Sequence, residues 1–229
     1  MTSTQRFTEI RAFLSSLPNH QVYKKNTSYL LSKRLIDIVV ASSIILLIMP
    51  WLTPIVALLI KLNSKGPIFF VQKRTGKDNK TFHCIKFRTM KLNKEADTQQ
   101  AITNDLRITR LGKILRLTHI DELPQFFNIL SGQMSFIGPR PLLPRYVPLY
   151  NTFQNRRHEV KPGITGLAQI KGRNNTSWDT RFNFDIYYVD NLSFKLDLKI
   201  FINTISKVLS FSNISPKDKQ FMDEFKGNN

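Results

Sequence analysis

The chain has 229 residues, of which 41% are hydrophobic, so it can build a sizeable core and is not a disordered protein. Its formal net charge of +18 predicts partners that carry negative charge: nucleic acid, anionic lipid or a phosphate-bearing substrate. The single cysteine, Cys84, excludes an intramolecular disulfide and a clustered-cysteine zinc site, and we expect it to be a small buried hydrophobe.

Residues 1–32 are interpreted as an accessory segment. Apolar residues recur at helical spacing between positions 7 and 17, which predicts a short amphipathic helix that ends before Pro18. No apolar core followed by a small-residue cleavage site is evident at this end. We therefore expect the basic domain to stay in the cytoplasm.

Residues 33–62 are predicted to enter a membrane. The stretch 35–60 carries only one charge, Asp37, and is long enough on paper to cross a bilayer. Pro50 lies near its middle, where it removes a backbone hydrogen bond and breaks the helix.

The flanking charges decide the topology. Lys33 and Arg34 precede the apolar run and Lys61 and Lys65 follow it, so both ends carry the basic residues that stay on the cytoplasmic side. This symmetry favours a re-entrant helix-break-helix hairpin with both ends on one face. A kinked spanning helix and a buried core helix of a soluble protein remain the alternatives.

Residues 63–210 show the pattern of a mixed, helix-rich α/β domain, and 211–229 form a polar tail. Hydrophobic periodicity and turn residues predict the following elements: strands at 68–72 and 81–87 joined by a turn at 76–79, helices at 111–117 and 123–130, a strand near 134–137, a short strand within 161–175, and a helix at 196–209.

Two adjacent carboxylates mark the most informative soluble segment, THIDELPQFFNIL. Pro124 is tolerated only in the first turn of a helix, so Asp121 and Glu122 are expected at that helix's N-terminus. Acidic residues often occupy such positions simply because they complement the helix dipole. Capping and catalysis therefore both remain open for this pair.

Cations recur at predicted turns and strand ends of the same domain. Arg140 stands out because Pro139 and Pro141 stiffen its backbone and present its planar fork to a phosphate. Two carboxylates among cations also suit a divalent metal that bridges to a diphosphate. The candidate phosphate-binding residues are Arg74, Lys86, Arg88, Arg116, Arg140 and Arg173.

Four stretches in the same order carry a family resemblance: KRLIDIVVASSIILLIMP, GPIFFVQKRTGKDNKTFHCIKFRTM, DELPQFFNILSGQMSFIGPRPLLPRY and KPGITGLAQIKGRN. From about residue 33 to residue 209 the chain resembles the bacterial sugar transferases, specifically the small monotopic polyprenyl-phosphate phosphoglycosyl transferases. It is similar to the members that transfer diacetylbacillosamine-1-phosphate.

The resemblance implies a re-entrant helix broken at Pro50 and a catalytic pair, Asp121 and Glu122. In that family the aspartate attacks a UDP-sugar, releases UMP and holds the phospho-sugar until polyprenyl phosphate takes it. Magnesium is required, which makes Asp121 and Glu122 candidate ligands of Mg²⁺. The six cations named above are then candidates for holding phosphates or orienting the pair.

The resemblance also implies partners and a location. A UDP-sugar is the donor, undecaprenyl phosphate is the acceptor, and an anionic lipid membrane attracts the basic surface. The expected location is the cytoplasmic face of the bacterial inner membrane, in the first membrane step of glycoconjugate assembly. Assembly into a homo-oligomer is compatible with the sequence, which does not reveal the sugar that is transferred.

Two other classes of protein compete with this interpretation. A charge of +18 alone would suit nucleic acid, but the basic residues are spread along turns and no nucleic-acid motif is present, so we expect no nucleic-acid partner. A membrane-anchored scaffold that only binds would share the anchor without the chemistry.

Overall fold

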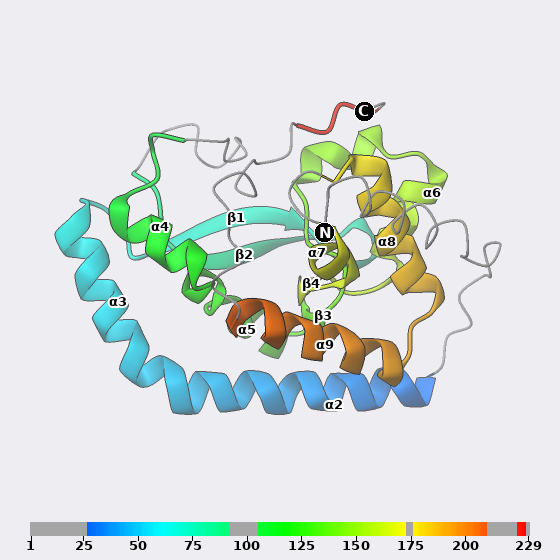
Figure 1. Ribbon diagram of the computed structural model, residues 1–229, viewed down its shortest axis with the longest axis horizontal. Helices are drawn as coiled ribbons and strands as arrows, with labels where there is room; N and C mark the ends of the chain where they lie inside the picture. Colours follow the sequence, from blue (N-terminus) through cyan, green and yellow to red (C-terminus); the bar gives the residue numbers. More distant parts are fainter. Residues whose placement is uncertain (1–26, 92–104, 173–175, 210–223, 228–229) are drawn as a thin grey trace.

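The computed structural model describes residues 27–91, 105–172, 176–209 and 224–227. In this part of the chain the helices are α2 (Thr27–Ser43), α3 (Met49–Asn63), α4 (Arg110–Leu117), α5 (Gln125–Leu130), α6 (Thr152–Asn155), α7 (Leu167–Lys171), α8 (Trp178–Asp190) and α9 (Phe194–Leu209). The strands are β1 (Phe69–Thr75), β2 (Thr81–Phe87), β3 (Ser135–Ile137) and β4 (Gly163–Thr165). Figure 1 shows a helix-rich mixed α/β arrangement, which confirms the expected fold class. The amphipathic helix expected within residues 7–17 lies outside the described residues.

The apolar segment forms one long helix that is interrupted near its middle. α2 continues through a π-helical turn, Ile44–Ile48, into α3, and Pro50 is the second residue of α3. A proline lacks the N–H that would bond to the preceding turn, and π turns commonly accompany kinks. The π-helical turn thus lies directly before Met49 and Pro50, where the sequence predicts the break. In Figure 1 the two arms diverge from the bend and do not pack side by side.

Charged residues bind the first arm to the domain. Arg34 donates hydrogen bonds to the carbonyl oxygens of Ile129 and Leu130 at 2.6 and 2.9 Å, where α5 ends. A cation at this position satisfies carbonyls that the helix leaves unpaired. Lys33 forms an ion pair with Asp197 of α9, with 2.7 Å between Nζ and Oδ2. α2 is therefore fixed to two helices of the domain.

β1 and β2 form an antiparallel hairpin that carries part of the site. The register pairs Phe69 with Phe87 and Thr75 with Thr81. The connecting turn contains Asp78, whose positive φ is a conformation that Asp tolerates better than most residues. Cys84 of β2 is 2% exposed, so the expectation that it is a small buried hydrophobe is confirmed.

β3 and β4 form a parallel pair and hold the loop that follows β3. Gly138 and Gly163 lie so close that a Cβ on Gly163 would approach the nitrogen of Gly138 to 2.1 Å. Glycine is needed here because the two backbones touch. The amide N–H of Gly163 also donates to the Pro139 carbonyl oxygen at 3.0 Å, which fixes the loop that carries Arg140.

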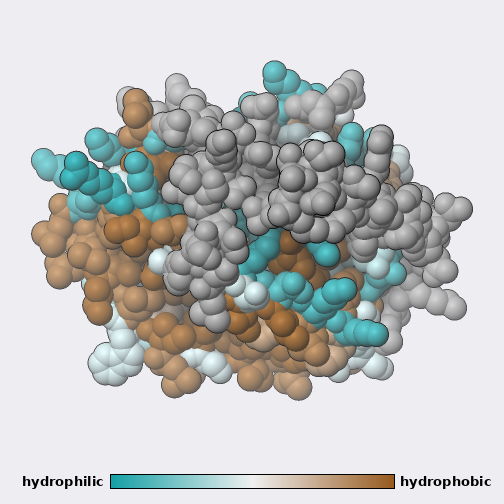
Figure 2. All heavy atoms as spheres, in the orientation of Figure 1, coloured by the Kyte–Doolittle hydropathy of each residue, from teal (hydrophilic) through white to brown (hydrophobic). Residues whose placement is uncertain are grey.

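A continuous apolar surface covers one side of the molecule. In Figure 2 hydrophobic atoms form a band along the lower side, where Figure 1 places α2, α5 and α9. Such an extent of exposed apolar surface marks a site of membrane or protein contact. The exposed large apolar residues on these helices, on the π-helical turn and on α3 and α4 include Leu31, Leu35, Ile36, Val39, Leu46, Leu47, Trp51, Ile55, Leu58, Leu62, Ile114, Phe127, Leu130, Phe194, Leu198, Ile202 and Ile205.

The one charge inside the apolar run, Asp37, faces the domain. It is 4% exposed, and its Oδ1 accepts hydrogen bonds from the Phe136 backbone N–H at 2.8 Å and from the Ser135 hydroxyl at 3.1 Å. Burying a carboxylate costs free energy, and such donors offset that cost because they replace water. Asp37 therefore joins α2 to β3.

We expect Asp37→Ala to lower the free energy of unfolding by about 1 to 3 kcal/mol, because it leaves the Phe136 N–H buried without an acceptor. Asp37→Asn retains an acceptor oxygen and should lose less. Thermal unfolding of the detergent-solubilised protein measures both variants. Equal stability of the alanine variant and the wild type would contradict this role.

Candidate active site

The carboxylate pair lies in a short 3-10 turn, Ile120–Glu122, between α4 and α5. His119 before it adopts a left-handed conformation with φ 57°, which reverses the chain after α4. Pro124 is the N-cap residue directly before α5, so the two carboxylates precede the start of this helix as predicted. Asp121 and Glu122 are 7% and 8% exposed.

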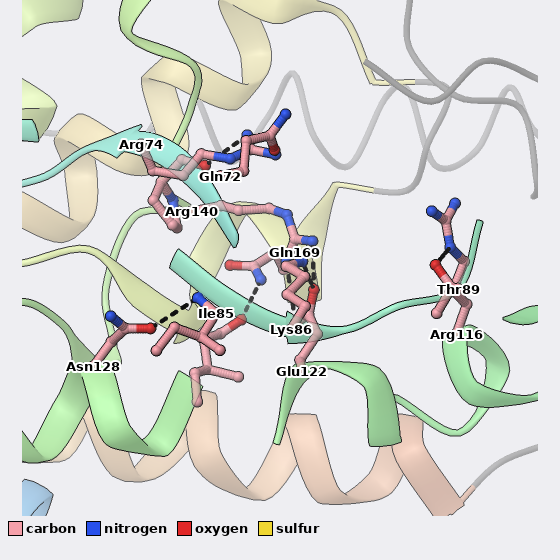
Figure 3. Close-up of polar contacts among 12 residues, drawn as sticks. Gln72, Arg74, Ile85, Lys86, Thr89, Arg116, Glu122, Asn128, Arg140 and Gln169 are labelled. Carbon is pink, nitrogen blue, oxygen red and sulfur yellow. Dashed lines mark hydrogen bonds and ion pairs between the residues drawn. The ribbon is translucent and has the colours of Figure 1, made fainter. Parts of the chain in front are cut away.

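Glu122 is held by two cations that come from different parts of the sequence. Lys86 of β2 lies 2.6 Å from Glu122 Oε1, and Arg140 Nη2 lies 2.7 Å from the same oxygen. A second nitrogen of Arg140 donates to Oε2 at 3.4 Å, so the arginine fork grips both carboxylate oxygens. Figure 3 shows Lys86 and Arg140 converging on Glu122.

Asp121 has a different environment from its neighbour. Within the described ranges no hydrogen bond or ion pair reaches its carboxylate, although the charges of Lys86, Arg116 and Arg140 act on it from a distance. A buried carboxylate without donors keeps its lone pairs free. Asp121 is therefore the carboxylate of the pair that is available to react.

These environments drive the two pKa values in opposite directions. Burial, and then the negative charge of Glu122, raise the pKa of Asp121 above its ordinary value of 3.8. Burial alone would also raise the pKa of Glu122, but the charges of Arg140 and Lys86 and their hydrogen bonds bring it well below 4.5. Neighbouring groups whose pKa values are pushed apart have different chemical roles.

The other predicted cations make contacts of their own. Arg116 lies close enough to act on Asp121, and its Nε donates to the Thr89 hydroxyl at 2.8 Å, as Figure 3 shows. Arg74 donates to the Gln72 side chain at 2.5 Å and to the Pro141 carbonyl oxygen at 3.3 Å.

Arg88 and Arg173 differ from the rest of the predicted set. Two nitrogens of Arg88 donate to the carbonyl oxygens of Lys65 and Ser64 at 2.5 and 2.7 Å, just after α3 ends. These hydrogen bonds attach the segment after α3 to the residue that follows β2. Arg173 lies outside the described residues.

The sequence analysis missed a second buried ion pair beside the site. Arg157 donates twice to Asp185 Oδ2 at 2.8 and 3.0 Å, and also donates to the Arg140 carbonyl oxygen at 2.8 Å. Asp185 lies in α8, which was not predicted. A charge between Phe184 and Ile186 in an otherwise apolar stretch was the available signal.

Two carboxylates define the metal-binding capacity of the site. In the part of the chain that the structure describes, no cluster of three or more His, Cys, Asp and Glu side chains is present. Mg²⁺ is commonly held by one or two carboxylates, with phosphates of the substrate and water as the remaining ligands. Asp121 and the less tightly bound Oε2 of Glu122 fit this donor set.

Comparison with known proteins identifies relatives of the whole region described above. A family model described as bacterial sugar transferase matches residues 28–211. The uncharacterized sugar transferase EpsL of Bacillus subtilis is 47% identical over 169 residues, which cover 73% of this chain and 83% of EpsL.

Longer relatives carry more specific names. The UDP-glucose:undecaprenyl-phosphate glucose-1-phosphate transferase of Klebsiella pneumoniae is 46% identical over 184 residues, covering 76% of this chain and 39% of that protein. The UDP-N-acetylgalactosamine-undecaprenyl-phosphate N-acetylgalactosaminephosphotransferase of Aeromonas hydrophila is 44% identical over 189 residues, covering 80% and 44%. The matched region thus spans less than half of these two proteins.

The opposite pKa shifts predict opposite effects on stability from two adjacent isosteric substitutions. Asp121→Asn should raise the unfolding temperature at pH 7, because the raised pKa means that ionised Asp121 opposes folding. This gain should vanish below about pH 3.8, where Asp121 is protonated in both states.

Glu122→Gln should instead lower the free energy of unfolding at pH 7 by roughly 1 to 3 kcal/mol, because it strips Arg140 and Lys86 of their counter-charge. Since the pKa of Glu122 is lowered on folding, its stabilisation is present above pH 4.5 and is lost as pH falls through the lowered value. Thermal unfolding from pH 3.5 to 8 measures both variants. Shifts of the same sign at pH 7 would contradict the division of roles.

Proposed function

Because the chain belongs to the bacterial sugar transferase family, we propose that it transfers a sugar-1-phosphate from a UDP-sugar to undecaprenyl phosphate. The observation that carries this proposal is a buried Asp121 without a bonded donor, next to a Glu122 that two cations hold in place. The printed activities of the Klebsiella and Aeromonas relatives support the choice of donor and acceptor.

In the first half of the reaction Asp121 is the nucleophile. Its ionised carboxylate attacks the phosphorus that bears the sugar, and a new P–O bond to Asp121 forms. The bond from that phosphorus to the bridging oxygen breaks, and UMP leaves with the bridging oxygen and its electron pair. Desolvation and the lack of bonded donors make the carboxylate more reactive than one in water.

In the second half undecaprenyl phosphate is the nucleophile. One of its phosphate oxygens attacks the phosphorus on Asp121, the acyl phosphate bond breaks, and the aspartate carboxylate is regenerated. The product is undecaprenyl diphosphate sugar, the lipid-linked start of a glycan. Dividing the transfer between two attacks lets a soluble donor and a lipid acceptor use one nucleophile in turn.

Lys86 and Arg140 act first on the protein and then on the substrate. They hold Glu122 and thereby fix the turn that carries Asp121. Lys86 and Arg140 each have further N–H donors, which can bind the phosphate oxygens as negative charge develops. Arg116 and Arg74, and Arg173 from outside the described residues, stay predicted contributors to phosphate binding, while Arg88 stabilises the junction after α3.

We infer that Asp121 and Glu122 hold Mg²⁺ together with the diphosphate of the donor. When bound, the ion supplies positive charge that neutralises the phosphate oxygens and the leaving UMP. The remaining charge is provided by the chain's own cations. Glu122 keeps one oxygen less tightly bound to Arg140, at 3.4 Å, which leaves it able to serve as a ligand.

We also propose that α2 and α3 form a re-entrant anchor in the bacterial inner membrane, with the domain on the cytoplasmic face. Their apolar helix has a mean hydropathy of 2.4 and is mostly exposed, so it needs a non-aqueous partner. Arg34 near its start and Arg88 near its end bind both arms to the same domain. Attachment of both ends to one domain supports a topology in which the two ends lie on the same side of the bilayer.

The reaction is tested with the protein in lipid nanodiscs, Mg²⁺, undecaprenyl phosphate and a panel of UDP-sugars. Wild type should release UMP with at least one donor, and chelation of Mg²⁺ should stop the release until the ion is restored. Asp121→Asn should reduce release by about 10³-fold or more, because the nucleophile is lost.

The same reaction without acceptor identifies the intermediate. Wild type should gain the mass of one sugar phosphate on the peptide that contains Asp121, and Asp121→Asn should gain none. Both proteins should insert into nanodiscs equally, which a pure scaffold would also do. UMP release by Asp121→Asn at the wild-type rate would contradict the mechanism.

Membrane topology is tested by single-cysteine labelling in a Cys84→Ser background. Ser28→Cys and Asn63→Cys, at exposed positions near the two ends of the helix, should react from the cytoplasmic side of inner-membrane vesicles. Trp51→Cys at the bend, where the native side chain is 77% exposed in the protein alone, should be shielded by lipid from a polar reagent. Labelling of the two ends from opposite sides would end the re-entrant proposal.

A further inference from the structure

Arg181, in the first turns of α8, is a cation without a bonded partner near the site. No hydrogen bond or ion pair joins its guanidinium to any residue within the described ranges. The acid one turn further along the helix, Asp185, is already bound by Arg157 at 2.8 and 3.0 Å. Burial lowers the pKa of Arg181 to about 10, so the guanidinium remains charged at neutral pH.

An aromatic ring orients this guanidinium without using its donors. The central carbon of Arg181 lies 5.1 Å from the centroid of the Trp178 ring, in a cation–π contact. Trp178 is 3% exposed and packs against Tyr146, Phe182 and Phe225 at centroid distances of 5.8, 5.7 and 5.3 Å. A stacked guanidinium keeps its N–H groups free for an anion.

The position of Arg181 connects it to the catalytic residues. The charge of Arg181 interacts with the charges of Asp185, Arg140 and Arg157, so these side chains lie near one another. Arg157 also bonds the Arg140 backbone at 2.8 Å, so α8 is attached to the loop that holds Glu122. Arg181 therefore lies on the helix that Arg157 connects to the Arg140 loop.

The charge balance of the site leaves a role for such a cation. Lys86 and Arg140 are the cations bonded to the pair, and Glu122 already neutralises part of their charge. A UDP-sugar brings two phosphates, and breaking the bond between them adds negative charge to the departing nucleotide. A further cation that is oriented but unpaired is suited to this charge, because it needs no rearrangement when the charge develops.

We propose that Arg181 binds the phosphate of the leaving nucleotide, UMP. The assignment rests on the proposed transfer reaction and adds a binding residue to it. The fork of Arg181 donates to the phosphate oxygens as the bridging oxygen leaves the sugar phosphate with its electron pair. Trp178 acts as a positioning residue because it fixes the plane of the fork.

The assignment is tested by calorimetric titration of the full chain in nanodiscs with UMP and, separately, with uridine. Arg181→Gln should weaken UMP binding by about 10- to 100-fold, the loss expected for hydrogen bonds between charged groups. Uridine has no phosphate, so its binding should be unchanged. Arg181→Lys retains the charge without the fork, so its affinity for UMP should lie between those of the wild type and Arg181→Gln. In the transfer assay KM for the donor should rise while KM for undecaprenyl phosphate stays constant.

Arg145→Gln is the matched control. Arg145 also lies over a ring of the same aromatic cluster, 5.4 Å from the centroid of Tyr146, but it is paired with Glu224 and well exposed. Its loss should leave the affinity for UMP unchanged. An equal loss in both variants would show a general effect of net charge and would overturn the assignment to Arg181.

Three further outcomes separate the possible failures. If Arg181→Gln binds UMP as wild type does, the assignment is wrong, even if the variant melts at a lower temperature. If Arg181→Gln does not fold, Arg181→Lys decides: a wild-type affinity for UMP and a wild-type donor KM overturn the assignment. If wild type itself binds neither UMP nor any UDP-sugar and transfers nothing, the proposed function fails together with the assignment.

Discussion

The ion-pair network of Glu122 with Arg140 and Lys86 is the interaction on which the rest of the site depends. It joins β2, the loop after β3 and the turn between α4 and α5, three segments that are distant in sequence. Because both cations are bonded to Glu122, its neighbour Asp121 is left desolvated without a bonded donor. Asp121 is thus a buried charge without a bonded donor in the part of the chain that the structure describes, an arrangement that is common where a group must react.

The broken helix bears on a separate requirement of the proposed reaction, namely that a soluble nucleotide and a lipid both reach one carboxylate. Its apolar surface continues onto the exposed faces of α5 and α9, so the same side of the domain that carries the helix also faces an apolar phase. Asp37 and Arg34 bind this helix to the strand and helix that support the site. If the helix lies in a membrane as proposed, this attachment would also fix the position of the carboxylate pair relative to the lipid.

Much of this arrangement could be predicted from local sequence rules. Pro124 restricts the start of α5 and so places the carboxylates, Pro50 restricts the helix interior and so places the break, and alternation marks β2. The partners of the cations could not be predicted, because Arg88 and Arg140 bind residues that are 18 or more positions away in the sequence. α8 escaped prediction for another reason: it is buried on several sides, so its apolar residues show no single stripe with helical period.

Within the described residues, the carboxylate of Asp121 and the guanidinium of Arg181 have no bonded partner, and in the proposed reaction the substrate supplies partners for both. Removing either charge from water without a partner costs free energy. The aromatic cluster around Trp178 and the ion pairs of Glu122 and Asp185 contribute stabilisation that offsets this cost. In the proposed reaction, a diphosphate would meet Asp121 as the nucleophile at one end and the guanidinium of Arg181, which lies over the Trp178 ring, at the other. Because this organisation precedes binding, the energy of substrate contact remains available for the transition state, where charge moves from the carboxylate toward the departing nucleotide.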